Sequence, residues 1–366
     1  MPDTPRRVVL FSHSYLGSKR RAGFQHLAAA FWRLGWDVTF VTAPISLFSR
    51  LRRDYRLAYP VFEQANRLVP VGERLTSFVL VTRLHPQNLR SPLANRLAAP
   101  LWRRYAHAPL GPLAGVLADA DLVVFESGVV LLLVDQVREL APHARVVYRA
   151  ADDLRHSGLH PVVREAEAAA MPTFDHVSVP TTQIAEALGP LGEVQLFPPA
   201  VDTEAFDRKT ESPYGEGPAA VFAGVWRHFD YDTLQMAAQL APHVAFHIVG
   251  VAPRPLPANV EFHAELPFDD LVPYFQHASF GLLLFPPGYT SLGQGNKVAQ
   301  YSYCRLPIVA PAHLEPDRAN MCVFEAGDRA SLQRALEEAE RMPHSPSFAE
   351  GIPSAEDLAL ALAGET

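Results

Sequence analysis

The opening order of apolar segments constrains the fold of this 366-residue chain more than any other feature. A buried strand is predicted by the apolar run RRVVLFSHS (6–14), and an amphipathic helix by the apolar spacing of RAGFQHLAAAFWRLGW (21–36). The next strand is predicted at DVTFVTAP (37–44). A strand, a helix and a strand in this order indicate a parallel βαβ unit, whose sheet places ligands at the carboxyl ends of its strands.

The same alternation continues to about residue 206 and starts again after a linker. The first series predicts strands at 120–127, 144–153 and 174–181, and helices at 161–171 and 182–188. Gly and Pro mark the linker DRKTESPYGEGP (207–218). The second series predicts strands at 219–225, 244–251, 259–266, 280–287 and 306–311, and helices at 230–241, 268–277, from Asn296 and within 354–364.

These two series predict an α/β protein with two Rossmann-like, doubly wound domains, residues 1–203 and 204–366, that face a central cleft. A chain of this length is sufficient for two such cores. We expect the last helix to be free to pack back on the first domain.

The amino-acid composition limits the cellular compartments in which the protein is expected. With 48% hydrophobic and 19% charged residues the chain is globular rather than disordered. Two cysteines, Cys304 and Cys322, suggest neither a disulfide framework nor a zinc cluster, and they fit a reducing compartment. We expect no signal peptide before the first strand, and the most apolar run, 128–134, is too short to span a bilayer. A cytoplasmic protein is therefore expected, at most peripheral to a membrane.

Basic charge is concentrated between Ile45 and Leu110. This region has eleven arginines and three acidic residues, which gives it a net charge of +8. Because the whole chain has a net charge of −7, the remaining residues together carry −15. Arginines interleaved with Leu, Phe, Tyr and Trp suit an anionic lipid surface, although a solvated helical face with extended arginines has the same pattern. Nucleic acid is not expected, because the basic charge is confined to one segment. The candidate membrane-facing residues are Arg50, Arg52, Arg53, Arg56, Trp102, Arg103 and Arg104.

A glycine-rich loop precedes the helix that is expected from Asn296. In this loop Gly293 and Gly295 allow the backbone to approach a ligand closely. The helix start offers N–H groups and a positive dipole, Lys297 adds a full charge, and Gln300 lies one turn further on. The pattern predicts a diphosphate site, whereas the alternative is a solvated lysine in a flexible loop.

Two stretches carry a resemblance to known proteins. The run from NVEFHAELPFDDLVPYFQHASFGLLLFPP through NKVAQYSYCRLPIVAP resembles the donor-nucleotide half of GT-B glycosyltransferases, and the first half of the chain resembles their acceptor-side domain. Within that superfamily, YRAADDLRHSGLHPVVREAE and the K-x-x-Q-Y run resemble GumK-type glucuronosyltransferases. That resemblance implies an inverting, membrane-associated enzyme of exopolysaccharide biosynthesis that moves glucuronate from UDP-glucuronate to a lipid-linked oligosaccharide.

The retaining GT-B enzymes depart from this chain at one point. Many of them carry two glutamates with seven residues between them, and the corresponding positions here are Leu292 and Gln300. Because neither is acidic, the resemblance implies an inverting enzyme. We assign no D-x-D pair to metal binding and therefore expect no metal, with the lysine and the helix dipole replacing a divalent cation.

On this resemblance the donor site contains residues from both ends of the second series. Trp226 would stack on the base or simply pack, and Arg227 or His228 would meet a uronate carboxylate. The predicted donor-binding residues are Lys297, Gln300, Asn296, Gly293, Gly295, Tyr289, Tyr301, Gly224, Val225 and Trp226.

An inverting transfer needs a base that takes the proton of the acceptor hydroxyl. Asp152 and Asp153 follow a predicted strand directly, and resemblance to the GumK-type Y-R-x-x-D pattern favours Asp152 as the base. Asp153 is the second choice, with capping of the next helix as its alternative role. Glu126, in FESG at the end of the preceding strand, is a rival.

The first strand-to-helix turn, SHSYLGSKRR (12–21), is a further candidate site. A glycine followed by basic residues at a helix start suits an acceptor diphosphate or a donor phosphate. The alternative is an exposed basic loop, with the histidine in a structural role. The candidate residues are His13, Gly17, Ser18, Lys19 and Arg20.

The function expected from these patterns is a metal-independent, inverting transfer from a UDP-sugar to a polyprenyl-diphosphate-linked saccharide, at the inner face of the plasma membrane. A UDP-sugar 2-epimerase on the same fold is one alternative, because it would also bind the nucleotide but would need no basic segment. A non-catalytic scaffold that binds a nucleotide sugar is the other.

Overall fold

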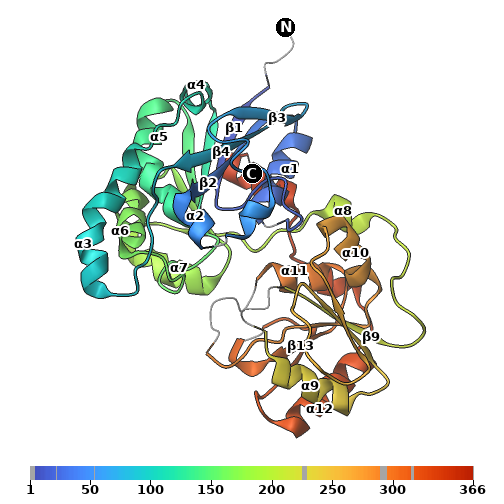
Figure 1. Cartoon of the computed structure of the whole chain (residues 1–366). Coiled ribbons are helices and arrows are strands. Elements are labelled where there is room, and N and C mark those ends of the chain that lie inside the picture. The colour runs from blue at the N-terminus through green and yellow to red at the C-terminus, as the bar shows by residue number, and fades with distance from the viewer. Residues whose placement is uncertain are drawn as a thin grey trace. The chain divides into compact units, whose positions relative to one another are not determined.

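The computed structural model describes residues 5–21, 23–52, 54–224, 229–288, 295–314 and 317–365. It divides into two compact units (Figure 1). Unit 1 contains the chain up to Pro198 and the segment from Ala355, whereas unit 2 runs from Pro199 to Ser354. Each unit is built on one sheet, as expected for an α/β protein.

The sheet of unit 1 has the order β3-β4-β2-β1-β5-β6-β7-β8. All neighbouring strands are parallel except β3 and β4. The strands are β1 (Arg7–Ser12), β2 (Asp37–Ser46), β3 (Leu68–Gly72), β4 (Leu75–Thr82), β5 (Leu122–Glu126), β6 (Arg145–Arg149), β7 (His176–Val179) and β8 (Gln195–Leu196). Its central strands are continuous apolar runs because helices cover both faces of a parallel sheet.

The helices of unit 1 are α1 (Gly23–Arg33), α2 (Leu47–Leu51), α3 (Pro92–Arg103), α4 (Leu113–Ala118), α5 (Val134–Leu140), α6 (Pro161–Ala170), α7 (Thr182–Leu188) and α13 (Ala355–Ala363). Helix α13 packs against α1, where Arg33 Nε donates to Glu356 Oε1 at 2.5 Å. The rings of Phe11 on β1 and Phe125 on β5 stack with centroids 4.7 Å apart, and both side chains are fully buried. Burial of each such ring stabilises the unit by roughly 1.5–3 kcal/mol.

The basic segment contains sheet that the sequence analysis did not predict. β4 lies parallel to β2, with Phe78 opposite Val41, and β3 turns back as the antiparallel edge strand. Phe78, Val79 and Leu80 have no exposed surface. The β-branched and aromatic run LTSFVLVT favours a strand, and the surrounding arginines obscured that signal.

The sheet of unit 2 is parallel throughout, in the order β11-β10-β9-β12-β13-β14. Its strands are β9 (Ala219–Ala223), β10 (Ala245–Val249), β11 (Val260–His263), β12 (Phe280–Leu282), β13 (Ile308–Pro311) and β14 (Met321–Phe324). Its helices are α8 (Thr203–Asp207), α9 (Tyr231–Leu240), α10 (Phe268–His277), α11 (Asn296–Tyr303) and α12 (Arg329–Arg341).

Three elements of unit 2, namely α8, β14 and α12, were not predicted, and α8 has only five residues. β14 has only four residues, too few for a clear pattern. Helix α12 is rich in charge, yet Leu332, Ala335, Leu336 and Ala339 recur at helical spacing and are buried. The strand β14 forms the edge of the sheet beside β13, and α12 packs against it.

Each sheet has one topological switch point, where the chain reverses the direction in which it adds strands. It lies between β1 and β5 in unit 1 and between β9 and β12 in unit 2. Open α/β sheets bind ligands at the carboxyl ends of the strands beside such a point. Among the described residues, no helix is both long and apolar enough to span a membrane.

Candidate functional site

A buried carboxylate lies at the switch point of unit 1. Glu126, the last residue of β5, has 3% of its surface exposed. Its Oε2 accepts a hydrogen bond from Ser12 Oγ at 2.5 Å and one from the backbone N–H of His13 at 3.1 Å. His13 Nδ1 lies 3.0 Å from the same oxygen. The parallel register of β1 and β5, with Phe11 opposite Phe125, brings these three residues together.

Glu126 and His13 form an ion pair. Burial alone would raise the pKa of Glu126, but the charge of His13 and the hydrogen bonds from His13 and Ser12 outweigh burial and lower it. In turn the charge of Glu126 raises the pKa of His13, against the opposing effects of desolvation and of Arg56. The imidazole is 47% exposed, so this histidine is anchored by a buried partner while it stays accessible.

Arg56 supports the backbone at His13 and does not face a membrane. Its Nη1 donates to the backbone oxygen of His13 at 2.8 Å, and its Nη2 lies 2.6 Å from Asp54 Oδ2. Desolvation would raise the pKa of Asp54, but the hydrogen bonds and charge of Arg56 outweigh it and lower that pKa. The prediction of a membrane-facing Arg56 is wrong, because the side chain is buried between Asp54 and the His13 loop.

Asp152 follows β6, the strand next to β5. Ser127 Oγ donates to the backbone oxygen of Asp152 and accepts from its backbone N–H, both at 3.2 Å. The same hydroxyl lies 3.1 Å from Tyr148 Oη, whose proton goes to Glu167 at 2.5 Å. These contacts fix the backbone of Asp152 and leave its carboxylate to face other groups.

The carboxyl of Asp152 is exposed to solvent, but the protein around it removes part of its hydration. This desolvation, followed by the negative charge of Glu126, raises the pKa of Asp152, while His13 acts in the opposite direction. A carboxylate with a raised pKa at the edge of a sheet is a suitable proton acceptor.

Asp153 is occupied by its neighbours. Its two carboxylate oxygens accept from Arg155 Nε and Nη2 at 2.8–3.0 Å, and His156 Nδ1 lies 3.1 Å away. Desolvation would raise the pKa of Asp153, but the hydrogen bonds from Arg155 outweigh it and lower that pKa. The predicted helix-capping role is wrong, because Asp153 caps a turn through the N–H of Arg155, whereas His160 is the N-cap of α6.

The loop that follows His13 is held by one glutamine. Gln25 Nε2 on α1 donates to the backbone oxygens of Tyr15 and Arg20 and to Ser18 Oγ, at 2.7–2.9 Å. The hydroxyl of Ser18 donates to the Arg20 oxygen at 2.6 Å, so it is used within the loop. Gly17 and Lys19 are exposed, and the N–H of Lys19 donates to Tyr59 Oη at 2.9 Å.

In unit 2, α11 presents the predicted lysine and glutamine side by side. Lys297 Nζ donates to Gln300 Oε1 at 3.2 Å and lies 5.3 Å from the centroid of the Phe275 ring. Gly295 is the N-cap of α11 and has no side chain to cap the first turn. Asn296, the first residue of the helix, is exposed. The first turn of α11 therefore combines helix N–H groups with one ammonium group, a suitable combination for an anion.

Tyr301 is a core residue, and its predicted contact with a nucleotide is wrong. The side chain has no exposed surface, and its hydroxyl donates to the Val221 oxygen at 3.2 Å. The ring packs on Gly281, where an added Cβ would lie only 2.6 Å from Tyr301 Cδ2. The residue joins α11 to the sheet.

Gly224 directly follows β9 at the switch point of unit 2. A Cβ on Gly224 would lie 2.9 Å from the Phe222 ring, and one on Gly250 would lie 2.6 Å from the Gly224 oxygen. Gly250 also has a φ of +80°, which side-chain-bearing residues rarely adopt. These two glycines therefore let the ends of β9 and β10 approach. The candidates Tyr289, Gly293, Val225, Trp226 and Arg53, together with Leu292, Arg227 and His228, lie outside the described residues.

The basic segment presents a mixed apolar and cationic surface. Trp102 is buried, with its ring edge-on to Phe48 at 6.1 Å, so the prediction that it faces a membrane is wrong. Arg50, Arg52, Arg103 and Arg104 are exposed, and Arg103 pairs with Glu165 at 2.8 Å. The sequence analysis missed three exposed leucines spaced four residues apart on α3, namely Leu93, Leu97 and Leu101, which are 67%, 74% and 42% exposed. That spacing was the available signal.

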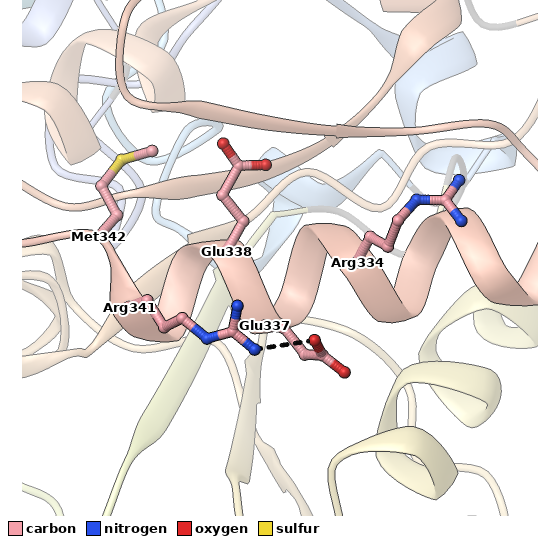
Figure 2. Close-up of a pocket in the computed structure, with 5 residues that line it drawn as sticks. All are labelled: Arg334, Glu337, Glu338, Arg341 and Met342. Carbon is pink, nitrogen blue, oxygen red and sulfur yellow. Dashed lines mark hydrogen bonds and ion pairs between the residues drawn. The ribbon is translucent and has the colours of Figure 1, made fainter.

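A pocket lies elsewhere in unit 2, on the side of α12 (Figure 2). Arg341 Nη2 pairs there with Glu337 Oε2 at 3.0 Å. The residues that line the pocket are Arg334, Glu337, Glu338, Arg341 and Met342. None of them is a predicted site residue, so the pocket is not assigned to the chemistry.

Known proteins resemble this chain in sequence. Residues 9–180 match the family model described as glucuronosyltransferase GumK, N-terminal domain. A UDP-glucuronate:glycolipid 2-beta-glucuronosyltransferase of Xanthomonas campestris pv. campestris is 26% identical over 346 residues, which cover 93% of this chain and 85% of that protein.

Solved structures resemble it in fold. HepE of Anabaena, in complex with UDP and glucose, has a TM-score of 0.60 at 14% identity and is matched over 97% of this chain and 94% of its own. An α,α-trehalose-phosphate synthase (UDP-forming) from Burkholderia vietnamiensis has a TM-score of 0.61 at 13% identity, over 98% and 93% of the two chains. Both likenesses extend over both units.

Proposed function

We propose that this chain is an inverting glucuronosyltransferase of the GT-B superfamily, because residues 9–180 match the GumK N-terminal family model and a glucuronosyltransferase is similar to it over 93% of its length. Its donor is UDP-glucuronate and its acceptor a lipid-linked saccharide of polysaccharide biosynthesis. The observation that carries the proposal within the site is Asp152, a carboxylate with a raised pKa beside the Glu126–His13 pair.

In the proposed reaction Asp152 is the base. It takes the proton of the acceptor hydroxyl as that oxygen attacks the anomeric carbon, and UDP leaves from the opposite face with the bonding electrons. The buried charge of Glu126 disfavours a second negative charge nearby, so it makes Asp152 a better proton acceptor. Asp153 is less suited, because Arg155 neutralises it.

His13 is the second candidate for the base. Glu126 binds its Nδ1 and leaves Nε2 on an exposed ring. A histidine oriented by a carboxylate is a common general base. The charge of Glu126 raises the pKa of His13, so this route would gain rate as pH rises through that raised pKa.

The donor diphosphate is assigned to the start of α11. Lys297 would neutralise the leaving phosphate, and the N–H groups of the first turn would bind its oxygens. Gln300, one turn on, would bind the ribose or the base. This arrangement supplies positive charge without a divalent cation, so the proposed transfer does not depend on added metal.

The exposed surface of the basic segment is assigned to the inner face of the plasma membrane. Leu93, Leu97 and Leu101 form one apolar stripe along α3, and exposed arginines flank it. Apolar side chains that enter the headgroup region beside cations that meet anionic lipid are typical of peripheral membrane proteins. Such a surface would bring the enzyme to a lipid-linked acceptor.

One assay tests the transfer. The purified chain is incubated with UDP-glucuronate, with and without a lipid extract of bacterial membranes, and free UDP and the sugar are measured. The proposal expects UDP release only with lipid, together with a glucuronate-bearing lipid product. An isomerised UDP-sugar without UDP release would instead indicate an epimerase, and tight binding with neither product would indicate a scaffold. The Asp152→Asn variant is the matched inactive control.

A further inference from the structure

Three potential metal ligands gather at the edge of the unit 2 sheet, and none of them is a residue assigned to donor or acceptor binding. They are His247 on β10 and Glu261 and His263 on β11. In the parallel register His247 is opposite Glu261, and His263 is two residues further on, so all three side chains lie on the same face of the sheet.

The three ligand atoms converge. His247 Nδ1 lies 2.9 Å from His263 Nε2 and 3.7 Å from Glu261 Oε2. Ligand atoms held about 2.1 Å from one zinc ion are roughly 2.9–3.6 Å apart for angles between 90° and 120°. The distance between the two imidazole nitrogens lies at the lower end of this range, and the Glu261 oxygen lies just beyond it from His247 Nδ1.

The two imidazoles share a hydrogen bond in this structure, and the chemistry of the three groups allows one ion to replace it. A single proton between the two imidazoles can serve one nitrogen pair, but the Glu261 carboxylate approaches the same Nδ1 of His247. One cation would accept lone pairs from all three groups at once. Two imidazoles and one carboxylate suit Zn²⁺ and similar late transition metals, whereas Mg²⁺ and Ca²⁺ prefer oxygen ligands.

The surroundings hold the ligands in place. His247 is buried, its ring is edge-on to Tyr214 with centroids 4.7 Å apart, and the Tyr274 ring lies 5.2 Å from that of His263. Tyr214 Oη donates to the Tyr274 oxygen at 2.6 Å, which joins the two aromatic neighbours. The side chain of Glu261 is 60% exposed, so the set is open to solvent on one side, where an ion can enter and a water can complete the coordination.

We infer that His247, Glu261 and His263 bind one Zn²⁺-like divalent ion, which fixes the edge strand β11 to β10. The strand β11 has four residues and a neighbour on one side only, so such a link would stabilise the least supported strand of the sheet. The ion is structural and does not take part in the proposed transfer, which is expected to need no metal.

The test uses the full chain after treatment with a chelator and its removal. Co²⁺ is titrated while visible absorption is followed, and Zn²⁺ is titrated by calorimetry and by thermal unfolding. We expect one ion to bind per chain and the unfolding temperature to rise with Zn²⁺. Bound Co²⁺ should show visible absorption typical of an ion with few ligands. The His263→Gln variant should bind at least about tenfold more weakly and lose both responses.

Two further variants keep the test decisive. His243→Gln is the control, because His243 also contacts a carboxylate, Glu340 at 2.8 Å, but belongs to no group of three potential ligands among the residues that the structure describes. It should bind the ion as the unchanged chain does. If His263→Gln fails to fold without metal, the exposed Glu261→Gln replaces it and should also weaken binding. Equal Co²⁺ affinity in the unchanged chain and the ligand variants, or equal loss in His243→Gln, would overturn the inference.

Discussion

The two sheets reach their switch points with opposite chemistry. In unit 1 the strand ends carry His13, Glu126 and Asp152, three titratable groups whose pKa values are shifted by one another. In unit 2 the residue that follows the first strand, β9, is Gly224, and the segment 287–311 contains no acidic residue. The same architecture thus carries a cluster of titratable side chains in one unit and a segment with no acidic side chain in the other.

This difference teaches how a duplicated fold can divide a reaction. An acidic group beside a diphosphate would repel it, whereas a base must be able to accept a proton. Separation of the two on different sheets allows each to be optimised alone. The comparison therefore predicts that a substitution in one unit will change either chemistry or nucleotide binding, but not both.

The largest effect is expected for Asp152→Asn. The amide keeps the size of the side chain but cannot take the acceptor proton, so transfer should fall by at least ~10²-fold. UDP affinity, a property of unit 2, should not change. Steady-state UDP release and calorimetric UDP binding measure the two quantities.

Asp153→Asn is the control for this substitution. It removes a carboxylate that Arg155 already neutralises, so it should retain most activity. A larger loss in Asp153→Asn would transfer the role of base to that residue. If both variants remained active, His13 or Glu126 would become the candidate, and a combined loss of activity and UDP binding in Asp152→Asn would contradict the division between the units.

The next effect concerns Lys297→Ala. Loss of a charge-assisted contact costs about 1.5–3 kcal/mol, so UDP should bind roughly 10- to 150-fold more weakly. Lys209→Ala, which removes an exposed lysine of the same unit, should bind UDP as before. Equal UDP affinity in the two variants would remove Lys297 from the donor site.

A smaller effect is expected at the membrane-facing surface, which the proposal places in unit 1. Arg50 and Arg52 are exposed, and each arginine near anionic lipid contributes about 1 kcal/mol, so a double change to Ser should lower liposome binding by roughly 30-fold at low salt. Arg334 and Arg341 on α12 of unit 2 provide the matched control. Sedimentation with anionic liposomes measures both, and equal loss in the two double variants would show that the charge acts without regard to its position.

The smallest effect tests the His13–Glu126 pair through pH. The pKa of His13 is raised by Glu126, so its stabilisation is complete below the unfolded value of about 6.5 and is lost as pH rises through the higher folded value. Solvent screens the exposed ring, so the contribution is under about 1 kcal/mol. The difference in unfolding free energy between the unchanged chain and His13→Gln should therefore be larger at pH 6 than at pH 9. A difference independent of pH would mean that the pair is not ionic.

Sequence patterns predicted the alternating elements well where burial dominates. The apolar runs of β1, β5 and β10 needed no knowledge of their neighbours, because a strand covered on both faces is apolar along its whole length. The strand β4 and the helix α12 were missed, because neighbouring arginines in one case and dense surface charge in the other masked the buried positions.

The site was harder to predict because its contacts join distant parts of the chain. Nothing in the sequence indicates that Arg56 would reach the His13 oxygen, or that Ser127 would hold the backbone of Asp152. The prediction for Tyr301 failed because it lies one helical turn after Lys297, which suggests a shared exposed face. In the structure its ring instead packs on Gly281. Side-chain direction on a short helix depends on its packing, which local spacing does not fix.

The return of the chain to unit 1 affects the order in which the protein is made. Helix α13 completes unit 1 by packing on α1, and Arg145 Nε donates to the Leu362 oxygen at 3.2 Å. The ribosome must therefore synthesise all of unit 2 before unit 1 receives this helix. Unit 2 enters and leaves through adjacent segments, where the N–H of Val201 donates to the Pro353 oxygen at 3.0 Å. All residues of unit 2 are therefore synthesised before those of unit 1 are complete. Until α13 is made, the face of α1 that it covers stays exposed, and chaperones can bind such apolar surface.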